Sequence, residues 1–193
     1  MKQIYTAKQA LEKLKNGNRI YLNTTQNLAD ISPASRHQNS TSQQPYALVL
    51  SCSDSRVPPE HIFQAGIGEL FVIRTAGNVV GDFTLGSMEY AITSLHVPLI
   101  IIMGHSHCGA VKAALNSEGV GYMKKVVDEV KQGIKETHDK KAAVYNNILH
   151  SHHQLMKSTI LQKLLQNKKI FIQCAYCDID SGEVSFFHPS SQF

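Results

Sequence analysis

The chain has 193 residues, of which 42% are hydrophobic and 18% are charged, and its formal net charge is +4. This length and balance are typical of one globular domain with a real core, and they exclude a disordered or fibrous chain. Lysine and arginine form no run long enough for a nucleic-acid surface, and no apolar run approaches the ~18 residues that cross a bilayer. We therefore expect neither nucleic acid nor a membrane as a partner.

Compartment is indicated by the N-terminus and by the cysteines. The first 22 residues are amphipathic and lack the apolar core of an export signal. Four cysteines in a chain of this size do not form a disulfide scaffold. A cytoplasmic protein with reduced thiols is the simplest interpretation, and a periplasmic location would need a signal removed ahead of residue 1.

The N-terminal part predicts a helix followed by an arm. Apolar residues recur near helical spacing over residues 6–22, which predicts a helix. Residues 23–44 are rich in Ser, Thr, Asn and Gln, which indicates an extended linker. We expect a single domain over 1–193, in which 1–44 form the helix and arm and 45–193 form the α/β core.

Three short apolar runs predict the first strands of the core. Residues 46–51, 70–74 and 98–103 are almost wholly apolar, as expected for parallel strands buried on both faces. Residues 84–96, between the second and third runs, have a helical pattern. The order strand, helix, strand indicates a right-handed parallel α/β unit.

The second half of the chain predicts helices and a closing hairpin. Helical patterns cover 109–115, 123–134 and a longer segment, 142–166. Two strands follow, at 168–180 and 183–187, with Asp180–Gly182 as the turn between them. The predicted fold is α/β: a central, mostly parallel sheet of about four parallel strands plus an antiparallel C-terminal strand, flanked by helices, with an N-terminal helical arm.

Metal-binding side chains follow two of the predicted strands. Cys52 comes directly after the first strand, and His105 and Cys108 come after the third. Because ligands bind beyond the carboxyl ends of strands in such sheets, adjacent strands would bring these residues together. Two thiolates and one imidazole suit zinc, as a catalytic site if one position stays open or as a structural site if a fourth ligand closes it. A buried core thiol is the alternative for Cys52.

Asp54 and Arg56 alternate with Cys52 at the same strand end. Asp54 could accept a hydrogen bond from zinc-bound water, and Arg56 could hold the carboxylate ionised and oriented. If Asp54 bound zinc directly, the site would be full and inert. A plain ion pair at a strand end is the structural alternative for these two residues.

Four segments together resemble one enzyme family. "CSDSRVPPEHIF" (52–63), "FVIRTAGNVV" (71–80), "GSMEYA" (86–91) and "GHSHCGAV" (104–111) resemble the β-class carbonic anhydrases, and the close resemblance covers roughly residues 43–115. It implies one zinc ion per subunit and reversible hydration of CO2 to bicarbonate and a proton by zinc-bound hydroxide. The implied zinc ligands are Cys52, His105 and Cys108, and the implied catalytic pair is Asp54 and Arg56.

The resemblance also implies substrate contacts and an assembly. Gln43 and the backbone N–H of Gly109 match positions that contact substrate, while Phe71, Ala76 and Tyr90 match positions that line a small apolar pocket from the neighbouring subunit. A homodimer or a dimer of dimers is implied, with the N-terminal helix and arm packing on a partner subunit. As alternatives, Gln43 would be a solvated linker residue, and Phe71 and Tyr90 would be ordinary core aromatics.

Two features depart from the family pattern. Part of the family has a tryptophan where this chain has Val49, and that tryptophan builds a regulatory bicarbonate pocket. We therefore expect this pocket to be absent or weak and the open site to be favoured. Cys174 and Cys177 stand near positions that often hold glycine and tyrosine. As a C-x-x-C pair they suggest redox or metal chemistry, but residues three apart on a strand point to opposite faces, which favours simple packing.

The histidines outside the motif have weaker interpretations. His150, His152 and His153 could form a cluster, but no carboxylate is close in sequence and a solvated or partly packed helix face is favoured. His107 could relay protons to solvent, although an ordinary surface residue is favoured there. Two alternatives to CO2 hydration remain open at this point. One is hydrolysis of CS2 or COS on the same scaffold, and the other is a non-catalytic, zinc-stabilised module with Asp54 as fourth ligand.

Overall fold

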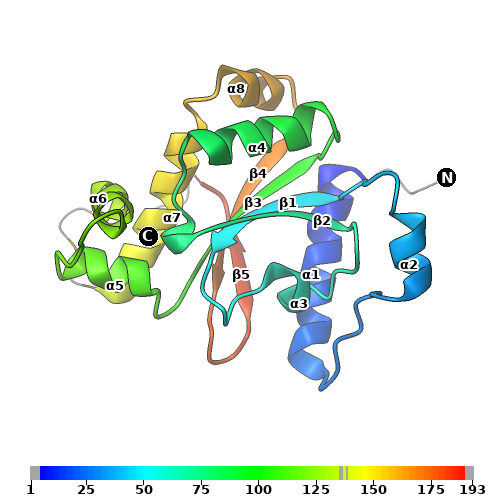
Figure 1. Ribbon diagram of the computed structural model, residues 1–193, viewed down its shortest axis with the longest axis horizontal. Helices are drawn as coiled ribbons and strands as arrows, with labels where there is room; N and C mark the ends of the chain where they lie inside the picture. Colours follow the sequence, from blue (N-terminus) through cyan, green and yellow to red (C-terminus); the bar gives the residue numbers. More distant parts are fainter. Residues whose placement is uncertain (1–4, 135–136, 138, 190–193) are drawn as a thin grey trace.

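The computed structural model describes residues 5–134, 137 and 139–189, and a five-stranded sheet forms its centre (Figure 1). The strand order is β2-β1-β3-β4-β5. The first four strands run parallel, and β5 pairs antiparallel with β4. The predicted fold class is therefore confirmed. The strands are β1 (Ala47–Cys52), β2 (Leu70–Thr75), β3 (Leu99–His105), β4 (Phe171–Cys177) and β5 (Val184–Phe187).

Burial differs between the centre of the sheet and its edge. Every residue of β1 and β3 is buried, as their apolar sequences predict. Every residue of β2 is only half-buried. The prediction that this strand is buried on both faces is therefore wrong for the single chain, because β2 has a neighbouring strand on one side only.

The N-terminal helix α1 (Ala7–Asn23) packs on the sheet of its own chain. Thr6 and Gln9 form a capping box at its start, and Ala10 and Leu14 are fully buried. That the helix also reaches a partner subunit stays a prediction. The arm is not extended throughout, because Pro33–Gln38 form the short helix α2, whose first turn is capped by Ser32.

The longer helices of the core follow the prediction with one exception, and two short helices in the core were not predicted. The short helices α3 (Pro59–Ile62) and η1 (Ala76–Asn78) precede α4 (Asp82–Thr93), and α5 (Gly109–Leu115) and α6 (Met123–Gly133) lie where expected. The segment 142–166 is not one helix but two, α7 (Lys140–Leu155) and α8 (Thr159–Gln166). The break occurs because the Ser158 side chain accepts a hydrogen bond from the backbone N–H of Leu161 and so begins a new helix.

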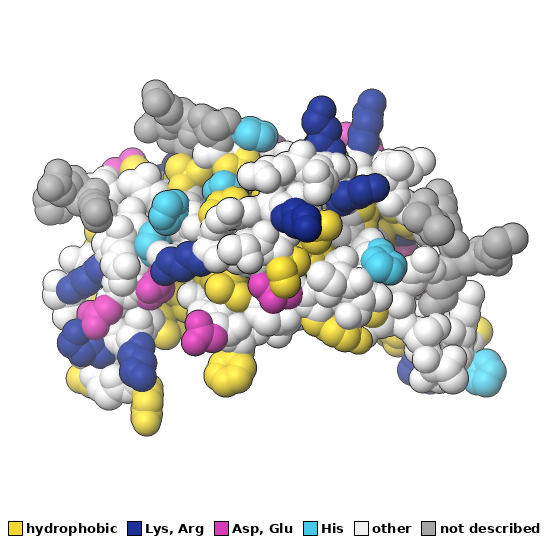
Figure 2. Space-filling model, turned by 90° about the horizontal axis from the view of Figure 1, so that it is seen from above, with side chains coloured by type: hydrophobic (Ala, Val, Ile, Leu, Met, Phe, Trp, Pro, Cys, Tyr) yellow, Lys and Arg dark blue, Asp and Glu magenta, His cyan; other side chains and the backbone are white. Residues whose placement is uncertain are grey.

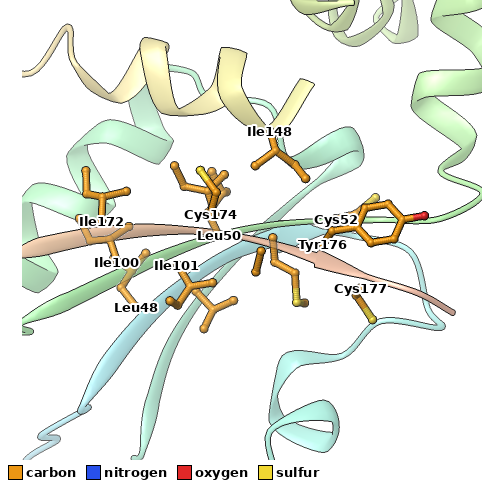
Figure 3. Close-up of a cluster of buried hydrophobic side chains, with 14 of the residues drawn as sticks. Leu48, Leu50, Cys52, Ile100, Ile101, Ile148, Ile172, Cys174, Tyr176 and Cys177 are labelled. Atoms are coloured by element: carbon orange, nitrogen blue, oxygen red, sulfur yellow. The ribbon is translucent and has the colours of Figure 1, made fainter. Parts of the chain in front are cut away.

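The hairpin between β4 and β5 turns at Gly182, whose φ of +77° favours glycine. Within β4, Cys174 lies on the same side of the sheet as Ile148 of α7, and Cys177 lies on the other side (Figure 3). Both thiols are free and buried, which confirms the packing interpretation. Burial raises the pKa of each thiol to about 12, so both stay protonated at neutral pH.

Several large hydrophobic side chains are exposed in the single chain. Phe83 is 94% exposed and Tyr90 is 49% exposed, and both belong to α4. Figure 2 shows hydrophobic side chains that reach the surface on the face seen from above. Within the described residues, none of the helices combines the length and the apolar character that a bilayer crossing needs.

Candidate metal centre

Three metal-binding side chains meet at the carboxyl edge of the sheet. Cys52 is the last residue of β1 and His105 is the last residue of β3, and these two strands are neighbours. Cys108 stands directly before the first residue of α5. The ligand atoms of the three residues all lie within 4.8 Å of one another, and all three residues are buried. The structure thus brings together the three residues that the strand ends predict.

The state of His105 tests whether a metal fits this site. Its Nδ1 lies 2.8 Å from the backbone carbonyl oxygen of Ser106, which makes Nδ1 the protonated, donating nitrogen. The other nitrogen, Nε2, is buried and has no hydrogen-bond partner among the described residues. A buried acceptor without a partner is unfavourable unless a ligand occupies it. Zinc binds sulfur and imidazole nitrogen at four-coordinate sites, so the donor set fits this metal.

The two thiols differ in acidity. The pKa of Cys52 is lowered, first by a hydrogen bond with the Cys108 thiol and also by the backbone N–H groups of Asp54 and Gly77, while burial opposes the shift. The same contact raises the pKa of Cys108, together with burial. Cys52 is therefore the thiol that loses its proton first, and a thiolate is the form that binds metal.

Asp54 and Arg56 form a two-pronged ion pair beside this cluster. Arg56 Nε donates to Asp54 Oδ1 over 2.9 Å and Nη2 donates to Oδ2 over 2.7 Å, while the Arg56 backbone N–H also donates to Oδ1. These contacts hold the pKa of the Asp54 carboxyl well below its usual range. Asp54 Oδ2 lies 4.0 Å from His105 Nε2. The carboxylate thus lies beside the His105 ligand atom of the cluster, and both of its oxygens accept hydrogen bonds from Arg56.

Arg74 is a contributor that the sequence analysis missed. From β2, its Nε donates to the carbonyl oxygen of Cys52 over 3.0 Å, and its Nη2 donates to the carbonyl oxygen of Asp54 over 2.5 Å. It therefore fixes the backbone that carries both side chains. The available signal was a charged residue at the end of an otherwise apolar strand.

The predicted pocket residues occupy different places. The rings of Phe71 in β2 and Tyr90 in α4 have centroids 6.2 Å apart, and Ala76 is exposed at the start of the loop after β2. Gly109 is exposed and directly follows Cys108. Gln43 is exposed and precedes β1, whereas Cys52 ends that strand, so in one chain these two residues belong to opposite ends of β1.

The remaining histidines are partly packed or exposed, as predicted. His150 Nε2 lies 2.8 Å from a Glu129 carboxylate oxygen on α6, a partner that sequence proximity did not reveal. His152 is half-buried, and burial lowers its pKa, with smaller contributions from His188 and His153. His107 is exposed with φ of +55°, and its carbonyl oxygen accepts a hydrogen bond from Arg56.

Comparison with known proteins gives one consistent result. The family model for carbonic anhydrase matches residues 47–184. Carbonic anhydrase 2 of Mycobacterium tuberculosis is 43% identical to this chain over 126 aligned residues, and the match covers 63% of this chain and 61% of that relative. The matched region therefore spans less than two thirds of the relative's length.

Solved structures extend the likeness to the fold. The β-carbonic anhydrase CcaA is 32% identical, with a TM-score of 0.69, over 79% of this chain and 84% of that chain. A structure from work on two tetrameric β-carbonic anhydrases of Sordaria macrospora is 25% identical, with a TM-score of 0.69, over 80% of this chain and 89% of that chain.

Proposed function

The chain belongs to the β-class carbonic anhydrase family, and on that premise we propose that it catalyses the reversible hydration of CO2 to bicarbonate and a proton. One observation carries the proposal. A buried cluster of two thiols and one imidazole leaves a ring nitrogen without a partner, and an ionised carboxylate lies directly beside it. This combination of a metal site and an adjacent hydrogen-bond acceptor suits activation of a water molecule.

We propose that zinc is held by Cys52, His105 and Cys108. When bound, zinc supplies a Lewis acid that makes water a nucleophile near neutral pH. The hydrogen bond from His105 Nδ1 to the Ser106 carbonyl keeps Nε2 available as a ligand. The backbone N–H of Gly77 donates to the Cys52 sulfur over 3.2 Å and so helps to hold it as a thiolate.

Asp54 and Arg56 have the proposed role of orienting the reacting water. Because the pKa of Asp54 is lowered by Arg56, the carboxylate stays ionised at neutral pH and can only accept hydrogen bonds. Accepting a hydrogen bond from a water molecule beside the cluster would turn a lone pair of that water toward CO2. The engagement of both Asp54 oxygens by Arg56 supports this open arrangement over one in which Asp54 is a fourth ligand.

Substrate contacts and assembly belong to the same proposal. The Gly109 N–H would contact substrate, and Phe71, Ala76 and Tyr90 would line an apolar pocket for the uncharged CO2. We propose a homodimer or a dimer of dimers, supported by the half-buried edge strand β2 and the exposed Phe83. Because Gln43 and Cys52 lie at opposite ends of β1, Gln43 is proposed to serve the site of a partner subunit. A cytoplasmic location is proposed from the four free thiols.

The deciding experiment measures zinc content and stopped-flow CO2 hydration on the same sample. We expect about one zinc ion per subunit and an activity that rises from neutral pH to about pH 8. Zinc-loaded protein without hydration above buffer at any alkaline pH would contradict the proposal. Parallel assays with CS2 and COS give the second arm, because turnover of these substrates in place of CO2 would assign a hydrolase.

A further inference from the structure

The loop after β2 passes the metal centre in an unusual backbone conformation. Gly77 has φ of +65° and Asn78 has φ of +48°, so two successive residues are left-handed. This conformation suits glycine and is tolerated by asparagine, but for asparagine it needs surrounding contacts to persist. A Cβ on Gly77 would also lie 2.9 Å from the Cβ of Ala110. Because Gly77 has no side chain, the backbone of this loop can lie close to its neighbours.

The position of the Gly77 backbone directs a hydrogen bond to a proposed metal ligand. The Gly77 N–H donates to the Cys52 sulfur over 3.2 Å, and both residues are buried. An N–H group directed at a thiolate stabilises its negative charge and restricts the direction of the sulfur. Such outer contacts typically change metal affinity by about 10- to 100-fold. The position of Gly77 therefore bears on how Cys52 meets a metal.

Two side chains of α7 hold the loop from the other side. Asn147 Nδ2 donates to the Gly77 carbonyl oxygen over 2.8 Å. The side-chain Nδ2 of Asn78 donates to Ser151 Oγ over 3.0 Å, and the Ser151 hydroxyl donates to the backbone carbonyl oxygen of Asn78 over 2.9 Å. Asn147 and Ser151 are one helical turn apart, so they share a face, and each is 1% exposed.

These polar residues interrupt an otherwise apolar stripe of α7. The helix buries Val144, Ile148 and Leu155 against the core, and Asn147 and Ser151 lie on that same buried face. A buried amide or hydroxyl is tolerated only when it is hydrogen-bonded. Here Asn147 and Ser151 donate to the backbone carbonyl oxygens of Gly77 and Asn78, and these bonds help to hold the left-handed conformation of the loop.

We propose that Asn147 is a positioning residue for the metal centre. It fixes Gly77, and through the Gly77 N–H it fixes the sulfur of Cys52, while Ser151 holds the neighbouring Asn78 in register. The inference rests on the proposed metal centre but not on the reaction that the centre performs. In this proposal α7 supports metal binding indirectly, through the loop, and contributes none of the three proposed ligands.

The test compares Asn147→Ala with the matched variant Gln154→Ala. Both changes truncate a buried amide of α7, but the Gln154 side chain contacts His150 and not the loop. Zinc affinity is measured by competition with a chelator, and the thiolate-to-metal charge-transfer band is recorded with Co²⁺ in place of zinc. We expect Asn147→Ala to bind zinc about tenfold more weakly and to shift the band. Gln154→Ala should keep the parent values.

Parent-like affinity and band in Asn147→Ala would overturn the proposal. Equal changes in both variants would also overturn it, since they would reflect a general loosening of α7. Should Asn147→Ala not fold, NMR of the cadmium-loaded parent decides: coupling between the metal nucleus and the Gly77 amide proton is expected, and its absence contradicts the role. Failure of the proposed function would look different, because the two variants would still differ in metal binding while CO2 hydration was absent in the parent.

Discussion

The chain contains two pairs of buried cysteines with opposite arrangements. Cys52 and Cys108 are far apart in sequence, yet their sulfurs share one cluster with His105. Cys174 and Cys177 are close in sequence, yet they point to opposite faces of β4 (Figure 3). Convergence of strand ends at one sheet edge therefore assembles a site here, whereas the short C-x-x-C spacing does not.

The two pairs also differ in acidity although all four thiols are buried. Burial alone raises the pKa of Cys174 to about 12. Cys52 is buried too, but its pKa is lowered because the Cys108 thiol and backbone N–H groups contact its sulfur. Polar contacts at the strand end thus outweigh burial, and the two pairs should respond differently to metal, to alkylation and to pH.

The largest expected difference is in metal content. Cys52→Ala should lose stoichiometric zinc and all CO2 hydration, because two ligands do not make a tight site. Cys174→Ala should keep about one zinc ion per subunit. Metal analysis after dialysis distinguishes the two variants. Full zinc occupancy in Cys52→Ala would contradict the proposal that only the first pair holds the metal.

The next effect concerns the carboxylate beside the first pair. Asp54→Ala should retain zinc while the rate of CO2 hydration falls about 100-fold or more, because the acceptor that orients the reacting water is removed. Asp128→Ala, which removes a surface carboxylate paired with Lys124, is the control and should behave as the parent. Stopped-flow rates at equal zinc content provide the measurement. A parent-like rate in Asp54→Ala would refute the proposed role.

A smaller difference is expected in the reactivity of the thiols. In metal-free protein at pH 7, Cys52 should be alkylated by iodoacetamide more than about tenfold faster than Cys174 or Cys177, since the thiolate is the reactive form. Zinc should protect Cys52. Peptide mass spectrometry over a time course identifies the labelled sites. Earlier labelling of Cys174 in folded protein would contradict the pKa difference.

The smallest effect is on stability at alkaline pH. A thiol whose pKa is raised on folding keeps its proton in the folded state, so its stabilising contribution is complete below the unfolded pKa of about 8.5 and is lost as pH rises toward about 12. The free energy of unfolding should therefore fall less steeply above pH 8.5 in Cys174→Ala than in the parent, by at most ~1.4 kcal/mol per pH unit. Urea unfolding at a series of pH values checks this. Parallel curves for parent and variant would show that Cys174 does not contribute.

Prediction from sequence worked best where the signal was local. Apolar runs located the strands, and the side chains after them pointed to one sheet edge. It was less successful where the signal depended on neighbours: β2 reads as fully buried but is an edge strand, and 142–166 reads as one helix but breaks at Ser158. The partner of His150 was missed because Glu129 comes from another helix.

The sequence by itself determined the order of strands and helices, the ligand types and the residues that end each strand, because these follow from periodicity and composition along the chain. Only the tertiary structure decided which His105 nitrogen is left without a partner and that both Asp54 oxygens accept hydrogen bonds from Arg56 beside the cluster. It also decided that Arg74 from β2 and Asn147 from α7 support the site. These features are hydrogen bonds that mostly join separate elements, and such contacts leave no periodic pattern in the sequence that encodes them.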